Sequence, residues 1–339
     1  MSAADQVVRI FTLGGTISAL GGDAGSQRLS GEQLVATSTG AGQGSGVRTE
    51  VEDFRRLPSS SLSFEDLGEL VDRVNDVAED STGVVVVQGT DTLEETAFLL
   101  DLTCSSAATV VVTGAMRRPD LPGADGPANL AGAVAVAADP GCRGLGVLAV
   151  LADEIHAARH VRKTHTTSIA TFASPGAGPL GLVVEGKPRL LLRPPHATVT
   201  PPLRLRRPAR VALVTLALGD GGELLDAVDD RFDGLVVAAF GAGHAPSWLV
   251  APLTALAARM PVVLASRTGS GPILSATYRG PGSEQDLLGR GLLSAGFLAP
   301  AKARLLLHAL LADGAGRERI AASFEALAQL GGIGAQPEG

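Results

Sequence analysis

The stretch that decides the fold runs from residue 84 to residue 112 and reads VVVVQGTDTLEETAFLLDLTCSSAATVVV. Two short β-branched apolar runs, Val84–Val87 and Thr109–Val112, flank a longer stretch with helical spacing, Leu93–Leu102. Apolar runs this short and continuous are typical of strands that are buried on both faces of a parallel sheet. The stretch therefore predicts a strand, a helix and a second parallel strand.

The same alternation extends outward in both directions. The further apolar runs are Val7–Leu13, Gly146–Leu151, Val211–Leu218, Leu235–Phe240 and Val262–Ala265, and the further helical stretches are Ala128–Ala138, Trp248–Ala258 and Ala301–Ala312. Alternating strands and helices indicate the α/β class. We expect a mostly parallel, doubly wound sheet in a larger N-terminal domain and a smaller α/β C-terminal domain.

Composition divides the chain in two places. Residues 193–208 carry five prolines and a cluster of arginines, which predicts a stiff connector between an N-terminal domain, 1–192, and a C-terminal domain, 209–339. The second place is Ala19–Gly46, which holds eight glycines after the first predicted strand. This segment is either a mobile lid or a surface loop.

Length, charge and cysteine content exclude several classes of protein. The chain has 339 residues, 45% of them hydrophobic, and a net charge of −7. So acidic a chain is not expected to bind nucleic acid. Two cysteines do not make a disulfide framework. The absence of a long apolar run and of a secretory signal predicts a cytoplasmic protein with no membrane partner.

Polar residues follow each predicted strand of the first half. The segments are Gly14–Ser18, Gln88–Thr92, Thr113–Arg117 and a stretch from Asp153 to Lys163. Ligands bind beyond the carboxyl ends of parallel strands, so two threonine hydroxyls, a carboxylate and a lysine can converge in one cleft. Each residue also has a plainer interpretation. Thr92 with Glu95 fits a capping box for the following helix, and Lys163 could be a solvated surface lysine.

His156 and His160 stand at helical i, i+4 spacing, but the order of a zinc-binding HExxH motif is absent. No metal site is therefore predicted.

The chain resembles the bacterial-type L-asparaginases, the amidohydrolases with two active-site threonines. The motifs that carry the resemblance are Leu13–Ser18 (LGGTIS), Gly89–Leu102 (GTDTLEETAFLLDL), Gly114–Arg117 (GAMR), Ala124–Asn129 (ADGPAN), Val161–Phe172 (VRKTHTTSIATF), Gly178–Gly181 (GPLG), Gly241–His244 (GAGH) and Pro300–Leu305 (PAKARL). They hold their order and spacing over nearly the whole chain.

The resemblance implies the roles of the site residues. Thr16 aligns with the nucleophile, and Thr90, Asp91 and Lys163 align with the second threonine–aspartate–lysine group. A threonine hydroxyl needs a base to take its proton, and a lysine can do so only in its neutral form. Asp91 is expected to bind the substrate's α-ammonium group. In the same way, Ser59 or Ser60 is expected to bind the α-carboxylate, and the backbone at Gly89, Thr90 and Ala115 to hold the carboxamide and its oxyanion.

Four positions depart from the family pattern. Leu29, thirteen residues after Thr16, stands where many members carry a tyrosine on a flexible loop. Tyr278, the chain's one tyrosine, falls where many members carry the acidic partner of that loop tyrosine. We hypothesise that Tyr278 of a neighbouring subunit supplies the missing phenol, the alternative being a structural loop tyrosine. His244 replaces an asparagine that reaches a neighbour's site, and could either alter selectivity or be an exposed loop histidine. Gln88 replaces a histidine, and we expect it only to tune activity.

The reaction that the resemblance implies is double displacement. Thr16 attacks the side-chain amide of L-asparagine, ammonia leaves, a β-aspartyl ester forms, and water releases L-aspartate, with no cofactor and minor activity on glutamine. The resemblance also implies a homotetramer or homodimer. Two alternatives are a non-catalytic amino-acid-binding relative and the amidase subunit of a tRNA-dependent amidotransferase. The second needs an extra N-terminal domain, for which the early position of Thr16 leaves no room.

Overall fold

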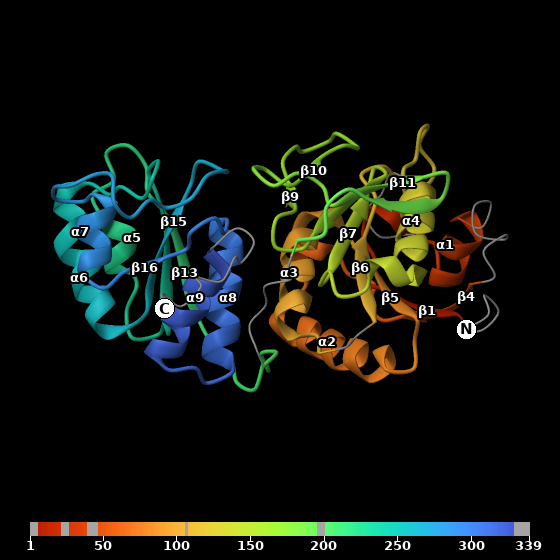
Figure 1. Cartoon of the computed structure of the whole chain (residues 1–339), viewed down its shortest axis with the longest axis horizontal. Helices are drawn as coiled ribbons and strands as arrows, with labels where there is room; N and C mark the ends of the chain where they lie inside the picture. The colour runs from red at the N-terminus through yellow and green to blue at the C-terminus, as the bar shows by residue number, and fades with distance from the viewer. Residues whose placement is uncertain (1–5, 22–26, 39–46, 106–107, 195–200, 329–339) are drawn as a thin grey trace, which may run out of the picture. The chain divides into compact units, whose positions relative to one another are not determined.

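The computed structural model describes residues 6–21, 27–38, 47–105, 108–194 and 201–328 (Figure 1). The chain divides into two compact units, Met1–His196 and Ala197–Gly339. In the described part of the predicted connector, residues 193–194 and 201–208, there is no helix or strand. Each unit has its own sheet and its own core, and each is described below by itself.

An eight-stranded sheet forms the centre of the N-terminal unit. Its order is β12-β11-β8-β7-β6-β5-β1-β4. The five strands at one end pair in parallel: β4 (Arg48–Asp53), β1 (Val7–Thr12), β5 (Gly83–Val87), β6 (Thr109–Thr113) and β7 (Leu148–Leu151). Every residue of β5 and β6 is buried, as the valine runs predict.

The other three strands extend the sheet in the antiparallel sense. They are β8 (Glu154–Ala157), β11 (Gly181–Val184) and β12 (Lys187–Leu190). The i, i+4 spacing of His156 and His160 does not reflect a helix, because His156 lies on β8, which pairs with β7 along its whole length. A turn at Ala152 and Asp153, both with positive φ, reverses the chain between β7 and β8.

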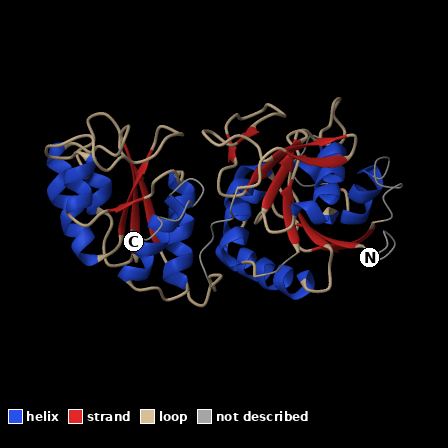
Figure 2. Ribbon diagram, in the orientation of Figure 1, coloured by secondary structure: helices blue, strands red, loops and turns tan. Residues whose placement is uncertain are grey.

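Helices cover both faces of this sheet, which makes it doubly wound (Figure 2). α4 (Gly126–Ala138) packs on β1, β5, β6 and β7 beside α1 (Gly31–Ser38), and α2 (Phe64–Ala78) and α3 (Leu93–Thr103) cover the other face. The core between α4 and the sheet is built from small and branched side chains, with leucines, valines and alanines in the majority.

The glycine-rich segment Ala19–Gly46 contains more regular structure than predicted. Ala19–Leu20 (β2) pairs with Gln27–Arg28 (β3), and α1 follows, with Leu34 buried in the core. Ser30 and Gln33 form reciprocal hydrogen bonds at the start of that helix, which is a capping-box pattern. Residues 22–26 and 39–46 lie outside the described residues, so the prediction of a mobile lid is not tested there.

The C-terminal unit is a smaller four-stranded parallel sheet in the order β13-β14-β15-β16. Its strands are β13 (Val211–Thr215), β14 (Gly234–Ala239), β15 (Val262–Ser266) and β16 (Leu293–Ser294). Its helices are α5 (Glu223–Asp226), α6 (Val250–Arg259), α7 (Glu284–Gly289), α8 (Pro300–Ala312) and α9 (Arg317–Ala328). In this unit α8 packs on β13, β14 and β15, and α5 packs beside α6.

Two predicted elements of this unit need correction. The apolar run to Leu218 leaves the sheet after Thr215, and Leu218 is 98% exposed in the following turn. Trp248 lies in a short 3₁₀ turn, Ser247–Leu249, ahead of α6. In the described part of the chain, no helix has both the length and the apolar character that a membrane crossing requires.

Candidate active site

The turns after β1, β5 and β6 meet at one edge of the N-terminal sheet. These strands are parallel neighbours, so their carboxyl ends lie together. Gly15 follows β1 with φ +94°, and a Cβ there would stand 2.3 Å from the Cα of Gly89. A Cβ on Gly114 would likewise stand 2.4 Å from the carbonyl oxygen of Gln88. Only glycine at position 15 allows the turn that carries Thr16 to contact the turn that carries Thr90.

The structure brings Thr90, Asp91 and Lys163 together. Thr90 and Asp91 begin the 3₁₀ turn Thr90–Thr92 that precedes α3, and Lys163 lies on β9 (Arg162–Lys163), which pairs with β10 (Phe172–Ala173). The Lys163 Nζ donates to Thr90 Oγ1 at 2.9 Å and to Asp91 Oδ1 at 2.8 Å. The lysine side chain is 18% exposed and the Asp91 side chain 64%, so this ion pair opens to solvent on the aspartate side.

The backbone of Lys163 is held by a residue that the sequence interpretation missed. Glu94, in the first turn of α3, accepts a hydrogen bond from the Lys163 amide through Oε2. The helix that begins just after Thr90 and Asp91 therefore also fixes the strand that carries the lysine. The only signal in the sequence is an acidic residue three positions after Asp91, which is common in the first turn of any helix.

Of the two candidate serines, the structure brings Ser59 to this group. Ser59 is 3% exposed, and its Oγ accepts from the Asp91 amide at 3.1 Å. Its carbonyl oxygen accepts from Thr92 Oγ1 at 3.0 Å. Ser60 is exposed on the same short turn, Ser59–Ser61. The predicted capping box at Thr92 is wrong, because the Thr92 hydroxyl bonds to Ser59 instead of capping α3.

Two residues of the ADGPAN segment, Asp125 and Asn129, hold the loop around Ala115. Asp125 accepts from the amides of Met116 at 2.9 Å and Arg117 at 2.8 Å. Asn129 donates to the Gly114 carbonyl at 2.9 Å and accepts from the Ala152 amide at 2.9 Å. The amides that follow Ala115 are thereby committed to Asp125, which fixes the orientation of the Ala115 carbonyl group.

Thr16 opens the 3₁₀ turn Thr16–Ser18 and is half-buried. Within the described residues, no side chain forms a hydrogen bond with its hydroxyl group. Leu29 offers no proton, as the sequence predicts, and it packs against the N-terminal core. The structure thus places Thr16 beside the Thr90 turn through the glycine contact, without a base already bonded to its hydroxyl.

Tyr278 and His244 form a separate cluster within the C-terminal unit. Their rings make an edge-to-face contact with centroids 4.7 Å apart. His244 Nε2 lies 3.3 Å from Oε2 of the fully buried Glu284, whose Oε1 accepts from the Tyr278 amide at 2.7 Å. Burial raises the pKa of the Glu284 carboxyl, but the amide hydrogen bonds from Tyr278 and Thr277 and the nearby His244 outweigh it and lower that pKa overall. Sequence interpretation missed Glu284, which organises this cluster.

Other nucleophiles and metal sites find no support in the described residues. Burial raises the pKa of the Cys104 thiol to about 12 and that of Cys142 to about 11, so neither is a thiolate at neutral pH. His156 Nδ1 lies 3.0 Å from Ser174 Oγ in the sheet. The described part of the chain holds no group of three or more residues able to bind a metal ion.

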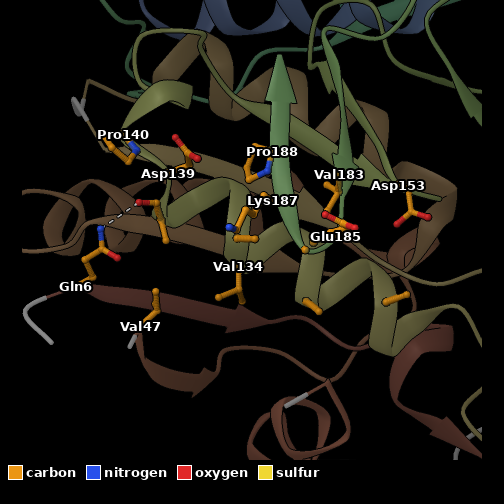
Figure 3. A pocket seen from close by; sticks show the side chains of 16 residues that line it. Gln6, Val47, Val134, Asp139, Pro140, Asp153, Val183, Glu185, Lys187 and Pro188 are labelled. Carbon is orange, nitrogen blue, oxygen red and sulfur yellow. Dashed lines mark hydrogen bonds between the residues drawn. The ribbon is translucent and has the colours of Figure 1, made fainter. Parts of the chain in front are cut away.

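A separate cavity lies elsewhere in the N-terminal unit. It measures about 480 Å³ and lies between α4 and the β11–β12 hairpin (Figure 3). Val134 from the helix and Val183, Glu185, Lys187 and Pro188 from the hairpin are among the residues that line it. None of the predicted site residues contributes to its wall.

Comparisons with known proteins find relatives along nearly the whole chain. Residues 7–196 match the family model described as Asparaginase, N-terminal, and residues 210–324 match the Glutaminase/Asparaginase C-terminal domain. A probable L-asparaginase of Deinococcus radiodurans is 39% identical over 283 residues, which cover 82% of this chain and 86% of that protein. An L-asparaginase of Bacillus licheniformis is 33% identical over 321 residues, covering 91% and 96%. The crystal structure of a probable cytoplasmic L-asparaginase from Campylobacter jejuni matches with a TM-score of 0.83 at 29% identity, covering 95% of this chain and 99% of that one.

Proposed function

Since this chain belongs to the asparaginase family, we propose that it hydrolyses L-asparagine to L-aspartate and ammonia through the threonine, aspartate and lysine groups described above. The observation that carries the proposal is the contact of Lys163 Nζ with both Thr90 Oγ1 and Asp91 Oδ1, directly beside the turn of Thr16. A lysine within hydrogen-bond distance of a threonine hydroxyl is the arrangement that proton transfer requires.

The reaction proceeds in two displacements. The Thr16 Oγ bonds to the side-chain carbonyl carbon of asparagine and gives up its proton. The C–N bond then breaks, ammonia leaves with an added proton, and a β-aspartyl ester of Thr16 remains. Water adds to the ester carbon, the ester C–O bond breaks, and the threonine hydroxyl and L-aspartate are released. The pair of Thr90 and Lys163 is suited to hold and move the proton in each step.

The neighbouring groups are suited to bind the substrate's two charged ends. The Asp91 carboxylate, with its exposed side, offers an anionic partner to the α-ammonium group. Ser59 is the better candidate for the α-carboxylate, because its oxygen already accepts from the Asp91 amide and its hydroxyl proton stays available to an anion. The backbone at Gly89 and Ala115 completes the carboxamide site. Minor turnover of glutamine fits the same chemistry, since one methylene changes binding by only about 1–3 kcal/mol.

The role of Tyr278 stays a proposal of its own. Its side chain is 49% exposed, so its phenol is available to a partner, and we propose that it serves the Thr16 of a neighbouring copy in a homodimer or homotetramer. Tyr278→Phe should then lower kcat by about two orders of magnitude or more with little change in stability. Near-normal turnover would assign Tyr278 to its own loop only. His244, against its ring, is proposed to affect selectivity between asparagine and glutamine.

Ammonia release from L-asparagine and L-glutamine, measured on the wild-type protein and on Thr16→Ala, tests the proposed function. Turnover of asparagine that disappears in the variant supports it. A non-catalytic binding protein would show a melting temperature raised by asparagine or aspartate and no ammonia. None of the relatives named above is a tRNA-dependent amidotransferase, so that alternative has no support. A cytoplasmic location is also proposed, in line with the description of the Campylobacter jejuni relative.

A further inference from the structure

Asp53, the last residue of β4, connects three segments of the N-terminal unit with one carboxylate. Its Oδ1 accepts from Thr12 Oγ1 at 2.7 Å and from the Gly31 amide at 2.9 Å. Its Oδ2 accepts from Arg56 Nη2 at 3.1 Å. The bonds from Thr12 and Gly31 therefore use the same oxygen atom of Asp53, and the bond from Arg56 uses the other.

Two of the three partners lie close in sequence to residues of the candidate active site, and the third begins a helix. Thr12 ends β1 four residues before Thr16. Arg56 lies three residues before Ser59. Gly31 is the first residue of α1, so Asp53 also places a negative charge at the positive end of that helix. The Asp53 carboxylate therefore bonds to the segment that leads to Thr16, to the segment that leads to Ser59 and to the start of α1.

Gly31 fits against Asp53 only because it has no side chain. A Cβ at position 31 would stand 2.3 Å from Val51 Cγ1, 2.9 Å from Asp53 Oδ1 and 3.0 Å from Thr12 Cγ2. The backbone of α1 therefore packs directly on the ends of β1 and β4. This close approach brings the Gly31 amide within hydrogen-bond distance of Asp53 and sets the position of the helix start.

The residues just before Gly31 lie against the turn that carries Thr16. The Leu29 amide donates to the Ser18 carbonyl at 2.8 Å. Arg28 Nη1 would be 3.1 Å from a Cβ on Gly14, the residue two positions before the nucleophile. A displacement of Gly31 would reach Thr16 through these contacts.

We propose that Asp53 is a positioning residue of the hydrolytic reaction, which fixes the Thr16 turn and the segment 27–31 relative to each other. The proposal rests on the function proposed above. Burial raises the pKa of the Asp53 carboxyl, but the hydrogen bonds from Thr12, Gly31 and Arg56 outweigh it, and the net shift is downward, which keeps the acceptor ionised.

Two variants of Asp53 separate the bonds to Thr12 and Gly31 from the ion pair with Arg56. Asp53→Asn keeps one carbonyl oxygen, which can still accept from both Thr12 and Gly31, and loses the negative charge and the acceptor for Arg56. Asp53→Ala removes all three bonds. We expect kcat to fall by about ten- to a hundredfold in Asp53→Ala, with KM changed by less than about threefold, and to stay within about threefold of wild type in Asp53→Asn.

Glu52→Ala is the matched control. Glu52 is the preceding residue of the same edge strand, points to the other face, and forms its own ion pair with Arg73 at 2.6 Å. The Glu52→Ala variant should lose the ion pair with Arg73, a surface interaction comparable to that of Asp53 with Arg56, and keep the wild-type kcat. Thr12→Val, which removes only the hydroxyl of a buried strand residue, is a second way to break the connection and should lower kcat in the same direction if Asp53→Ala folds poorly.

The stoichiometry of L-aspartate binding, measured by titration calorimetry, reports the fraction of competent sites in each variant. A full number of sites with reduced kcat in Asp53→Ala and Thr12→Val, and rescue in Asp53→Asn, supports the positioning role. Wild-type kcat in Asp53→Ala, a loss only in proportion to the number of sites, or an Asp53→Asn as slow as Asp53→Ala would overturn it. If the wild-type protein itself releases no ammonia, the proposed function fails instead, whatever the variants show.

Discussion

Replacing Lys163 by methionine keeps the length of the side chain and removes the ammonium group. The structure gives that group two hydrogen bonds, to Thr90 Oγ1 and Asp91 Oδ1. The bond from the charged ammonium group to Thr90 contributes about 1.5–3 kcal/mol to stability, and the ion pair with the 64% exposed Asp91 about 0–1 kcal/mol. Lys163→Met should therefore lower the free energy of unfolding by no more than about 4 kcal/mol.

Turnover should fall as well, because the proposed proton-transfer group itself is removed. Removing a positioned proton-transfer group lowers the rate by about 10²–10⁴-fold, which corresponds to about 2.7–5.5 kcal/mol of activation free energy. Ammonia release under saturating asparagine gives kcat, and urea denaturation gives the free energy of unfolding. Lys187→Met is the control, since Lys187 is an exposed lysine at a cavity that none of the candidate site residues lines. A Lys163→Met protein that keeps more than about a tenth of the wild-type kcat would refute the role given to this lysine.

Three further predictions concern supporting residues. Asn129→Ala leaves two backbone groups without their partner, so the free energy of unfolding should fall by about 2–5 kcal/mol in urea denaturation, and a loss below about 1 kcal/mol would contradict the contacts described. Glu94→Ala should lower kcat by about tenfold because it frees the backbone of Lys163, whereas Glu94→Gln keeps an acceptor and should stay near wild type in the same ammonia assay; equal kcat values for the two variants would argue against this role. Burial lowers the pKa of His308 from 6.5 to about 4, so the unfolded chain binds the extra proton, and the stability present above pH 6.5 should fall by on the order of 3 kcal/mol as the pH drops from 6.5 to 4. His308→Gln should remove that part of the pH dependence, as measured by urea denaturation at each pH.

The buried parallel strands could be predicted from sequence because burial on both faces leaves a continuous apolar run. β5 and β6 follow that rule to within one residue of the predicted bounds. β4 could not be found in this way. It is an edge strand with the sequence RTEVED, whose residues are half-buried or exposed, so it shows no apolar run. The antiparallel strand β8 was missed for a related reason, since its four residues, EIHA, form no continuous apolar run.

The prediction of site residues depended on the distance along the chain between the groups involved. Thr90 and Asp91 are adjacent in one motif, so the sequence alone places them together. That Lys163 joins them was predicted from the resemblance to the family, and the structure has the contact. The supporting contacts are different. The bond from Lys163 to Glu94 joins residues 69 positions apart, and that from Thr12 to Asp53 joins residues 41 apart. Neither residue type nor spacing identifies such bonds, because each acidic residue also suits an ordinary surface position.

The backbone contact between Gly15 and Gly89 has a consequence for how the enzyme can be altered by directed evolution. Any side chain at position 15 would overlap the main chain of the neighbouring turn, and main chain cannot move aside as a flexible side chain can. Position 15 should therefore accept no substitution in a saturation library selected for activity. Exposed Ser60, on the turn beside this contact, should by contrast tolerate many residue types. Changes in substrate preference must come from the side chains around the glycine contact. A mutant library should therefore keep Gly15 and Gly89 fixed and vary the surrounding positions.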